Sequence, residues 1–156
     1  MAKILLFISV LFVFFLPCRA EKVIHIHKDL CRLDLIEGCD TICSFPVSVG
    51  INKGQKTKEG DNKTPEGTFW VWMIQDSRKW DYDFGDGAGK RKGAYGDWFI
   101  RLKCPMSDHI GIHGTCFPES VGYRSSRGCV RLRNEDLAIL RQHVKYKMKV
   151  IIYPDK

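Results

Sequence analysis

Short segments rich in branched and aromatic residues, separated by turns, follow residue 20 and constrain the fold more than any other feature. Such residues favour the pleated, half-buried surface of a β-strand. The segments predicted as strands are 23–27, 32–36, 41–49, 68–74, 98–102, 109–112 and 149–153. The pair Glu37-Gly38 predicts a hairpin between the second and third segments. Thr64-Pro65-Glu66-Gly67 predicts a turn before the fourth, because proline presets the backbone φ angle.

One helix is predicted near the end of the chain, over residues 134–144. Asn134 is a suitable N-cap, and Glu135 and Asp136 place negative charge in the first turn, where it complements the helix dipole. Leucine and valine residues spaced three and four apart then form an apolar face. The predicted fold class is therefore mainly β, a β-sandwich-like domain with one late helix. The four tryptophans are expected to line the core and a groove rather than form a ligand cage.

The first twenty residues have the pattern of a secretory signal peptide. Lys3 precedes an almost unbroken apolar run over residues 4–16, and Cys18-Arg19-Ala20 places small residues at the expected cleavage site. The run is too short and too near the terminus to cross a bilayer comfortably. We therefore expect a signal peptide over residues 1–20, a domain over 21–156, no stable membrane span after cleavage, and export to the periplasm or cell envelope. A lipid anchor on the cysteine of that triplet is the alternative, but Pro17 suits such processing poorly.

The formal net charge of +7 indicates what the surface can attract. Its simplest explanation is a solvated surface, and the alternative is attraction to an anionic polymer or a membrane surface. Nucleic acid is not expected as a partner, because no recognition motif accompanies the charge and the chain is predicted to be exported. We expect a monomer.

Six cysteines follow the predicted cleavage site, and an oxidising compartment permits disulfides. They are Cys31, Cys39, Cys43, Cys104, Cys116 and Cys129. If Cys129 stays a thiol, five remain and at least one cannot pair within the chain, so the pairing is left open. The first three are close enough in sequence to form one bridge. A zinc site with His25 and His27 is the alternative, but the spacing matches no compact zinc module.

Two loops rich in glycine and charge, 53–63 and 81–97, are predicted to be solvated. The second contains Gly85-Asp86-Gly87-Ala88-Gly89-Lys90, which is similar to a phosphate loop. Its spacing is short, and Arg91 stands where a metal-binding hydroxyl is needed. Its aspartates suggest a calcium loop, but Lys92 stands where the closing glutamate should be.

The strongest functional motif consists of His113-Gly114 and, after a loop, Ser126-Arg127-Gly128-Cys129-Val130-Arg131. A thiol with a positioned imidazole is a nucleophile–base pair, so Cys129 and His113 are the predicted catalytic residues. An N–H beside the thiol can hold an oxyanion, and Gly128 and Gly114 are expected to give backbone support there. The guanidinium of Arg131 can bind a carboxylate through two parallel hydrogen bonds.

This motif closely resembles the active-site region of the L,D-transpeptidases, the YkuD-like family of bacterial cell-wall enzymes. The family pattern is a histidine-glycine pair, a variable loop, then serine, a variable or histidine residue, glycine, cysteine, a branched residue, and arginine or asparagine. Further matches are segment 45–50, the turn at 59–69 and the helix start at 134–137. Many members carry histidine where this chain has Arg127. A guanidinium cannot accept a proton, so the role of base falls to His113.

The resemblance implies that Cys129 attacks the carbonyl between the diamino acid and the terminal D-alanine of a peptidoglycan tetrapeptide stem. D-alanine leaves, a thioester forms, and an amine of a second stem takes the acyl group to give a 3→3 cross-link. Water as acceptor makes the same site an L,D-carboxypeptidase. Arg131, Ser126 and Arg127 are expected to bind substrate, and no metal or cofactor is expected. The alternative from another class is a non-catalytic cell-wall-binding module that uses Cys129 structurally.

Overall fold

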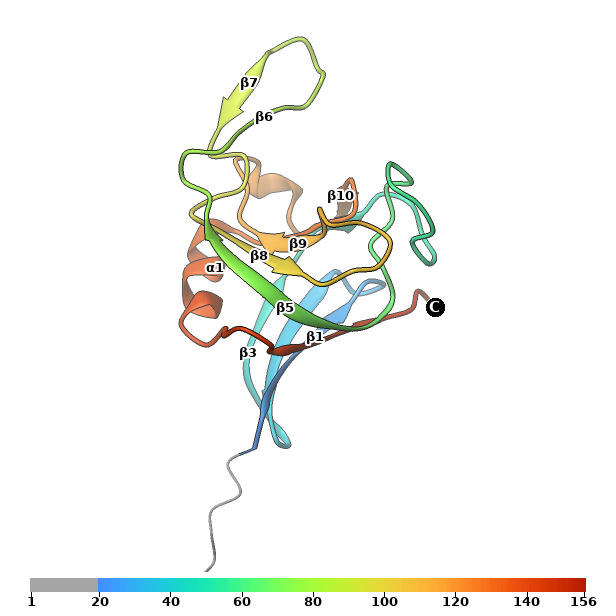
Figure 1. Cartoon of the computed structure of the whole chain (residues 1–156), viewed down its shortest axis with the longest axis vertical. Helices are drawn as coiled ribbons and strands as arrows, with labels where there is room; N and C mark the ends of the chain where they lie inside the picture. The colour runs from blue at the N-terminus through green and yellow to red at the C-terminus, as the bar shows by residue number, and fades with distance from the viewer. Residues whose placement is uncertain (1–19) are drawn as a thin grey trace, which may run out of the picture.

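The computed structural model describes residues 20–156, so the predicted signal peptide lies outside it except for its last residue (Figure 1). In this part of the chain the main sheet has eight strands, in the order β11-β9-β8-β5-β12-β1-β2-β3. The first three strands of the chain form one end of this sheet: β1 (Lys22–His27), β2 (Arg32–Glu37) and β3 (Asp40–Pro46). The others are β5 (Gly67–Asp76), β8 (Trp98–Leu102), β9 (Gly111–His113), β11 (Val130–Arg131) and β12 (Lys149–Tyr153).

Smaller elements surround this sheet. The short strand β4 (Val49–Gly50) pairs in parallel with β10 (Arg124–Ser126). An antiparallel hairpin of β6 (Asp81–Asp83) and β7 (Lys90–Lys92) projects from the body of the molecule (Figure 1). The helix α1 (Asn134–Arg141) follows β11 directly, and a single 3₁₀ turn occupies Pro118–Ser120.

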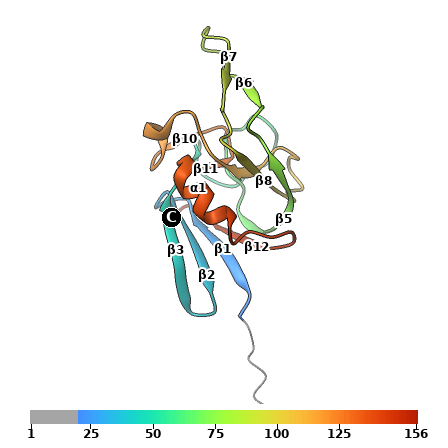
Figure 2. The same cartoon turned by 90° about the vertical axis from the view of Figure 1, so that its left-hand side faces the viewer.

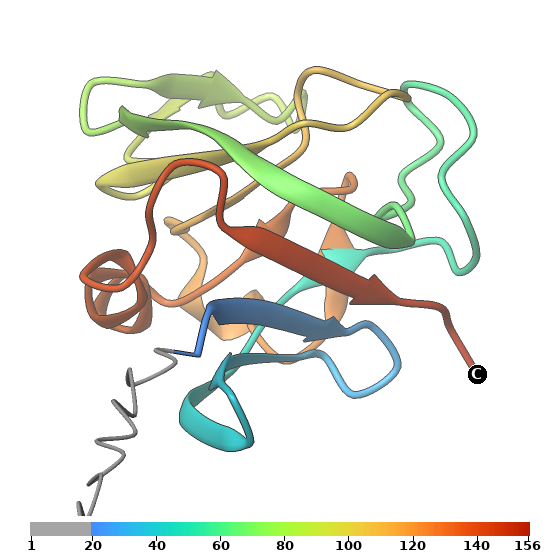
Figure 3. The same ribbon diagram turned by 60° about the horizontal axis from the view of Figure 1, so that its bottom comes forward.

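The main sheet is strongly curled, and its two ends enclose one hydrophobic core (Figures 2 and 3). Alternate residues of β1, β2, β5, β8 and β12 face this core, as the pleat of a strand requires. The helix adds Leu137 and Leu140, both fully buried. The prediction of a mainly β, sandwich-like domain with a late helix is therefore confirmed.

Several predicted boundaries differ from the structure for local reasons. The segment predicted over 41–49 is divided, because its chain leaves β2 after Pro46 and then pairs with β10 as β4. The helix ends at Arg141 rather than residue 144, and its N-cap is Arg133 rather than Asn134. The Asn134 side chain instead accepts a hydrogen bond from the N–H of Thr115 at 3.0 Å, which ties the helix start to the segment after His113.

A buried lysine links the turn between β1 and β2 to the segment that precedes β5. Lys28 is 0% exposed, and its Nζ donates to Glu66 at 2.5 Å and to the backbone carbonyl of Thr64 at 3.3 Å. Its ammonium also lies 3.0 Å from Asp155, which pairs with Arg124 as well. Opposite charges and carbonyl oxygens thus compensate a charge that is shielded from water.

Replacing Lys28 with methionine is expected to lower the free energy of unfolding by about 3 kcal/mol, because Glu66 loses its buried partner. This loss is at the low end of the range for breaking a buried ion pair, since Arg124 still compensates the charge of Asp155. Urea denaturation of this variant beside Lys58→Met, a change at an exposed lysine, measures the difference. Equal stability of the two variants would contradict a structural role for Lys28.

Candidate active site

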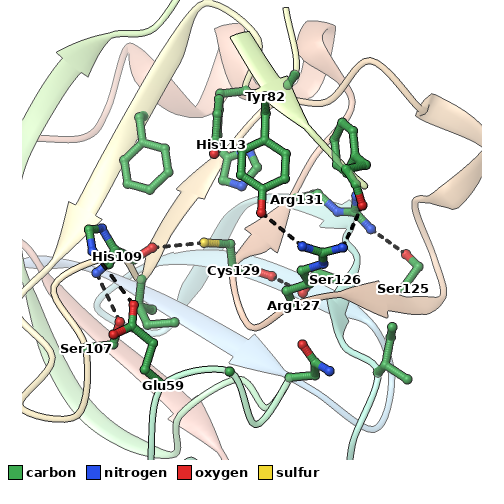
Figure 4. Close-up of a pocket in the computed structure, with 18 of the residues that line it drawn as sticks. Glu59, Tyr82, Ser107, His109, His113, Ser125, Ser126, Arg127, Cys129 and Arg131 are labelled. Atoms are coloured by element: carbon green, nitrogen blue, oxygen red, sulfur yellow. Dashed lines mark hydrogen bonds and ion pairs between the residues drawn. The ribbon is translucent and has the colours of Figure 1, made fainter. Parts of the chain in front are cut away.

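Two short parallel strands bring the predicted histidine and cysteine to one edge of the sheet. In the pairing of β11 with β9, Val130 lies opposite Ile112 and Arg131 opposite His113. Neighbouring strands are about 4.8 Å apart, so the residue before Val130 lies beside the β9 strand that ends at His113. Cys129 immediately precedes β11, and its thiol and the His113 ring line the same cavity (Figure 4).

The turn before the cysteine has a backbone shape that requires glycine. Gly128 has a φ of 130°, and a Cβ there would lie 2.8 Å from the carbonyl oxygen of Lys63. Ser126 closes the turn, since its Oγ accepts from the N–H of Gly128 at 3.1 Å and donates to the carbonyl of Cys129 at 2.6 Å. In this structure Ser126 therefore shapes the loop that presents the thiol.

Thr64 supports the same turn from a distant part of the chain. Its hydroxyl donates to the carbonyl of Gly128 at 2.9 Å and accepts from the N–H of Gly50 at 2.8 Å. Sequence reasoning identified the Thr-Pro turn but assigned Thr64 no part in the site. The only available signal was a threonine before proline within a segment similar to the family.

The surroundings of the Cys129 thiol favour its protonated form. Its Sγ lies 3.2 Å from the backbone carbonyl oxygen of His109, which can accept its hydrogen. Burial raises the pKa of the Cys129 thiol, and the backbone N–H of Gly111 and the positive charges of Arg131 and Arg101 only partly oppose this effect. A base is therefore needed to form the thiolate at neutral pH.

The imidazole of His113 is suited to be that base. It is 4% exposed and stacks on Phe99, with ring centroids 5.2 Å apart. Its Nδ1 lies 2.6 Å from the carbonyl oxygen of Gly114, and because a carbonyl only accepts, Nδ1 carries the proton. Burial lowers the pKa of His113 to about 4, so the ring is neutral at pH 7. Its Nε2 therefore has a free lone pair.

Arg131 places a positive charge in the same cavity as the Cys129 thiol. It is 8% exposed and lines the cavity, and one guanidinium nitrogen donates to Ser125 at 2.8 Å. Its Nε is buried without a hydrogen-bond partner, and in the described chain it is not ion-paired with the helix residues Glu135 or Asp136. A buried guanidinium with unused donors is a site for an anion.

The cavity has a volume of about 680 Å³, within the range usual for ligand sites. One wall is aromatic and comes mainly from the β6–β7 hairpin and its neighbours: Trp80, Tyr82, Phe84, Tyr95 and Phe99. Arg127 joins this wall to the cysteine loop, because its guanidinium donates to the Tyr82 hydroxyl at 3.1 Å and to the Phe84 carbonyl at 2.8 Å (Figure 4). These bonds use two of the five N–H donors of Arg127, a residue expected to bind substrate.

Both glycines expected to support an oxyanion use their N–H groups elsewhere. The N–H of Gly114 donates to the carbonyl of Tyr95 at 2.8 Å, and that of Gly128 donates to Ser126. A Cβ at Gly114 would also collide with Asn134. Their contribution in this structure is thus to backbone shape. The N–H of Cys129 itself donates to no acceptor within residues 20–156.

Other residues singled out from the sequence lie elsewhere or act differently. The six cysteines of the described chain are all free, so the bridge considered among the first three is not formed. His25 contacts the Tyr153 hydroxyl at 2.8 Å, and residues 20–156 contain no group of three side chains able to hold a metal. Trp70 and Trp72 are 47% and 46% exposed, so the assignment of all tryptophans to core and groove lining was wrong.

In the part of the chain that the structure describes, no helix has the length and apolarity to cross a membrane.

Comparison with known proteins gives a consistent family. Residues 21–152 match the L,D-transpeptidase catalytic domain model, YkuD. The L,D-transpeptidase YkuD of Bacillus licheniformis is 39% identical over 122 residues, which cover 78% of this chain and 59% of that protein. The Bacillus subtilis protein of the same name is 37% identical over 109 residues, covering 70% of this chain and 52% of the relative. The chain thus spans little more than half the length of these relatives.

Solved structures support the fold. The chain is similar to L,D-transpeptidase 3 of Mycobacterium tuberculosis, crystallised with a faropenem-derived adduct, with a TM-score of 0.64 and 17% identity, covering 86% of this chain and 60% of that one. It is also similar to the L,D-transpeptidase of Xylanimonas cellulosilytica, with a TM-score of 0.61 and 20% identity over 88% and 62% of the two chains. The family model covers most of the chain, and the chain therefore belongs to the L,D-transpeptidase catalytic domain family.

Proposed function

We propose that this protein is an exported peptidoglycan L,D-transpeptidase of the cell envelope, acylated on Cys129 by tetrapeptide stems and forming 3→3 cross-links. The observation that carries the proposal is a neutral His113 imidazole, oriented by the Gly114 carbonyl, in the same cavity as the Cys129 thiol. Family membership supports the substrate class. The cationic and aromatic walls of the cavity suit a peptide that ends in a carboxylate.

In the proposed acylation the thiol turns from the His109 carbonyl towards His113, whose Nε2 takes its proton. Sγ bonds to the carbonyl carbon between the diamino acid and the terminal D-alanine. The oxyanion that forms can accept a hydrogen bond from the free N–H of Cys129. The carbon–nitrogen bond then breaks, and the proton on Nε2 passes to the leaving amine.

In the second step an amine of another stem attacks the thioester. His113 takes a proton from this amine, the carbon–nitrogen bond forms, the carbon–sulfur bond breaks, and the proton returns to Sγ. Water in place of the amine releases a tripeptide stem and makes the reaction a carboxypeptidase. Both acceptors fit the same chemistry.

Incubation with a purified disaccharide-tetrapeptide, followed by mass spectrometry, tests this function. We expect dimers that have lost one D-alanine for each cross-link formed. Trimmed monomers alone would identify a carboxypeptidase. Unchanged monomers, together with no addition of a carbapenem to Cys129, would contradict an enzymatic role and favour the binding module.

Arg131→Lys is expected to slow acylation by the tetrapeptide roughly 10- to 100-fold, because lysine cannot make two parallel bonds to the terminal carboxylate. The melting temperature should change little, since the guanidinium makes few contacts with the scaffold. Acylation rates by intact-protein mass spectrometry, with Arg133→Lys as a control outside the cavity, measure the effect. Normal acylation with a lowered melting temperature would instead assign Arg131 to the scaffold.

The pH dependence of acylation follows from the state of His113. Only the neutral imidazole accepts a proton, and its pKa is lowered from 6.5 to about 4. The acylation rate should therefore persist as the pH falls through 6 and decline only near pH 4 to 5. Single-turnover rates between pH 3.5 and 8 measure this acid limb. A midpoint at or above 6.5 would contradict a buried, neutral base.

A further inference from the structure

An exposed aromatic surface lies on β5, outside the catalytic cavity. Along this strand Phe69 and Val71 face the core, whereas Trp70 and Trp72 point outward and are 47% and 46% exposed. Tyr146, 53% exposed, lies beside them with its ring centroid 6.2 Å from that of Trp72. We call these three residues the outer aromatic face. Exposed aromatic side chains gathered in this way indicate a binding surface.

Lysines surround the outer aromatic face. The Nζ of Lys103 lies 5.3 Å from the ring centroid of Trp72, and that of Lys147 lies 5.5 Å from the ring of Tyr146. Lys149 on β12 lies directly opposite Trp70 in the strand register. The surface therefore combines flat apolar rings with hydrogen-bond donors and positive charge, and residues 20–156 provide no partner that covers it.

This surface is continuous with the catalytic cavity across the sheet. Phe99 pairs with His113 and stacks on its ring, and Arg101, on the same face of β8, lines the cavity. Arg101 pairs with Met73, and a register shift between Val71 and Met73 leaves both Trp72 and Met73 exposed on the outer side of β5. Strands β9, β8 and β5 lie side by side (Figure 1). A polymer bound at Trp72 can therefore extend along one face of the sheet towards Cys129.

We propose that the outer aromatic face binds the glycan strand of peptidoglycan, a polymer of β-linked, N-acylated amino sugars; this assignment rests on the proposed function. A pyranose ring has a face of C–H groups that packs on the electron-rich face of an aromatic ring. The lysines can donate to sugar hydroxyls and acyl oxygens and attract carboxylates of neighbouring stems. The bound strand would place its stems near the cavity and raise their local concentration there.

Binding to insoluble sacculi tests the proposal. In the Cys129→Ala background, which prevents turnover, the double variant Trp70→Ala/Trp72→Ala should lose roughly tenfold or more in affinity, since two stacking contacts are removed. Ile139→Ala, on α1 and also 46% exposed, should bind like the parent. Trp72→Phe in place of alanine should recover part of the binding. Melting temperatures measured in parallel distinguish lost contacts from unfolding.

The second arm uses the active protein and two substrates. The double tryptophan variant should act normally on the soluble disaccharide-tetrapeptide but more slowly on intact sacculi. Unchanged sacculus binding would overturn the proposal. So would tryptophan-dependent binding to phosphatidylglycerol vesicles, which would identify a membrane surface, or tryptophan-dependent dimerisation in sedimentation, which would identify a second copy. If instead the proposed function is wrong, the unaltered protein will not turn over the soluble muropeptide. That result is distinct from unchanged sacculus binding by the tryptophan variant.

Discussion

Replacement of Cys129 by alanine is expected to abolish thioester formation and D-alanine release, with a rate loss on the order of 10⁴ or more. The covalent intermediate cannot form without Sγ, and among residues 20–156 no other thiol lines the cavity. The fold should persist, because the turn is held by hydrogen bonds between the Ser126 and Thr64 hydroxyls and the backbone, rather than by the thiol. Mass spectrometry after incubation with the tetrapeptide donor measures thioester formation, and circular dichroism measures whether the fold persists.

Two other cysteines provide the controls. Cys116→Ala alters a half-buried thiol in the loop after the histidine, and Cys104→Ala alters a buried one in the core. Both variants should still be acylated, although the second should be less stable because it leaves a small cavity. A carbapenem, which mimics an acyl donor, should add once to each control and not to Cys129→Ala. A thioester on the Cys129→Ala protein would show that the nucleophile is misassigned.

His113→Ala is expected to lower turnover by about 10² to 10⁴, the usual contribution of a general base. The loss should appear in acylation, because the neutral ring accepts the thiol proton before Sγ attacks. The ring is also buried against Phe99, so alanine leaves a cavity and should lower the melting temperature. His113→Gln keeps more of the volume and should remain nearly as inactive while being more stable, which separates catalysis from packing.

His109 is the matched control for this prediction. Its side chain is exposed and lies 3.8 Å from Glu59, whereas the contact with the thiol is made by its backbone carbonyl. His109→Ala keeps that carbonyl and should lose little activity. Equal losses in the His109 and His113 variants, measured as single-turnover acylation rates, would mean that the roles of the two imidazoles are misassigned.

The longer strands were predictable because each has enough alternating residues to identify a buried and an exposed face. The predicted segments 23–27, 98–102 and 149–153 agree with β1, β8 and β12 to within one residue. The short strands β10 and β11 were not predicted, since two or three residues carry no periodicity. The β6–β7 hairpin was not predicted for another reason. Its strands are polar, and they pair with each other outside the main sheet.

The sequence alone determined which groups can do chemistry. The glycine-cysteine pair, the preceding histidine and their order along the chain predict a nucleophile and a base, because only a few residue types can fill these roles. The same motif, with its flanking segments, identified the family and hence the mainly β fold. The chemical type of each side chain and its order along the chain are read directly from the sequence.

Only the tertiary structure decided how the surrounding groups are used. Arg127 supports the hairpin through Tyr82, Asn134 holds the segment after His113, and Thr64 holds the turn at Gly128. Each of these hydrogen bonds joins residues far apart in the sequence, so spacing along the chain carries no information about it. The exposure of Trp72 has the same origin, since apolar composition does not say which face of a strand the packed core will cover.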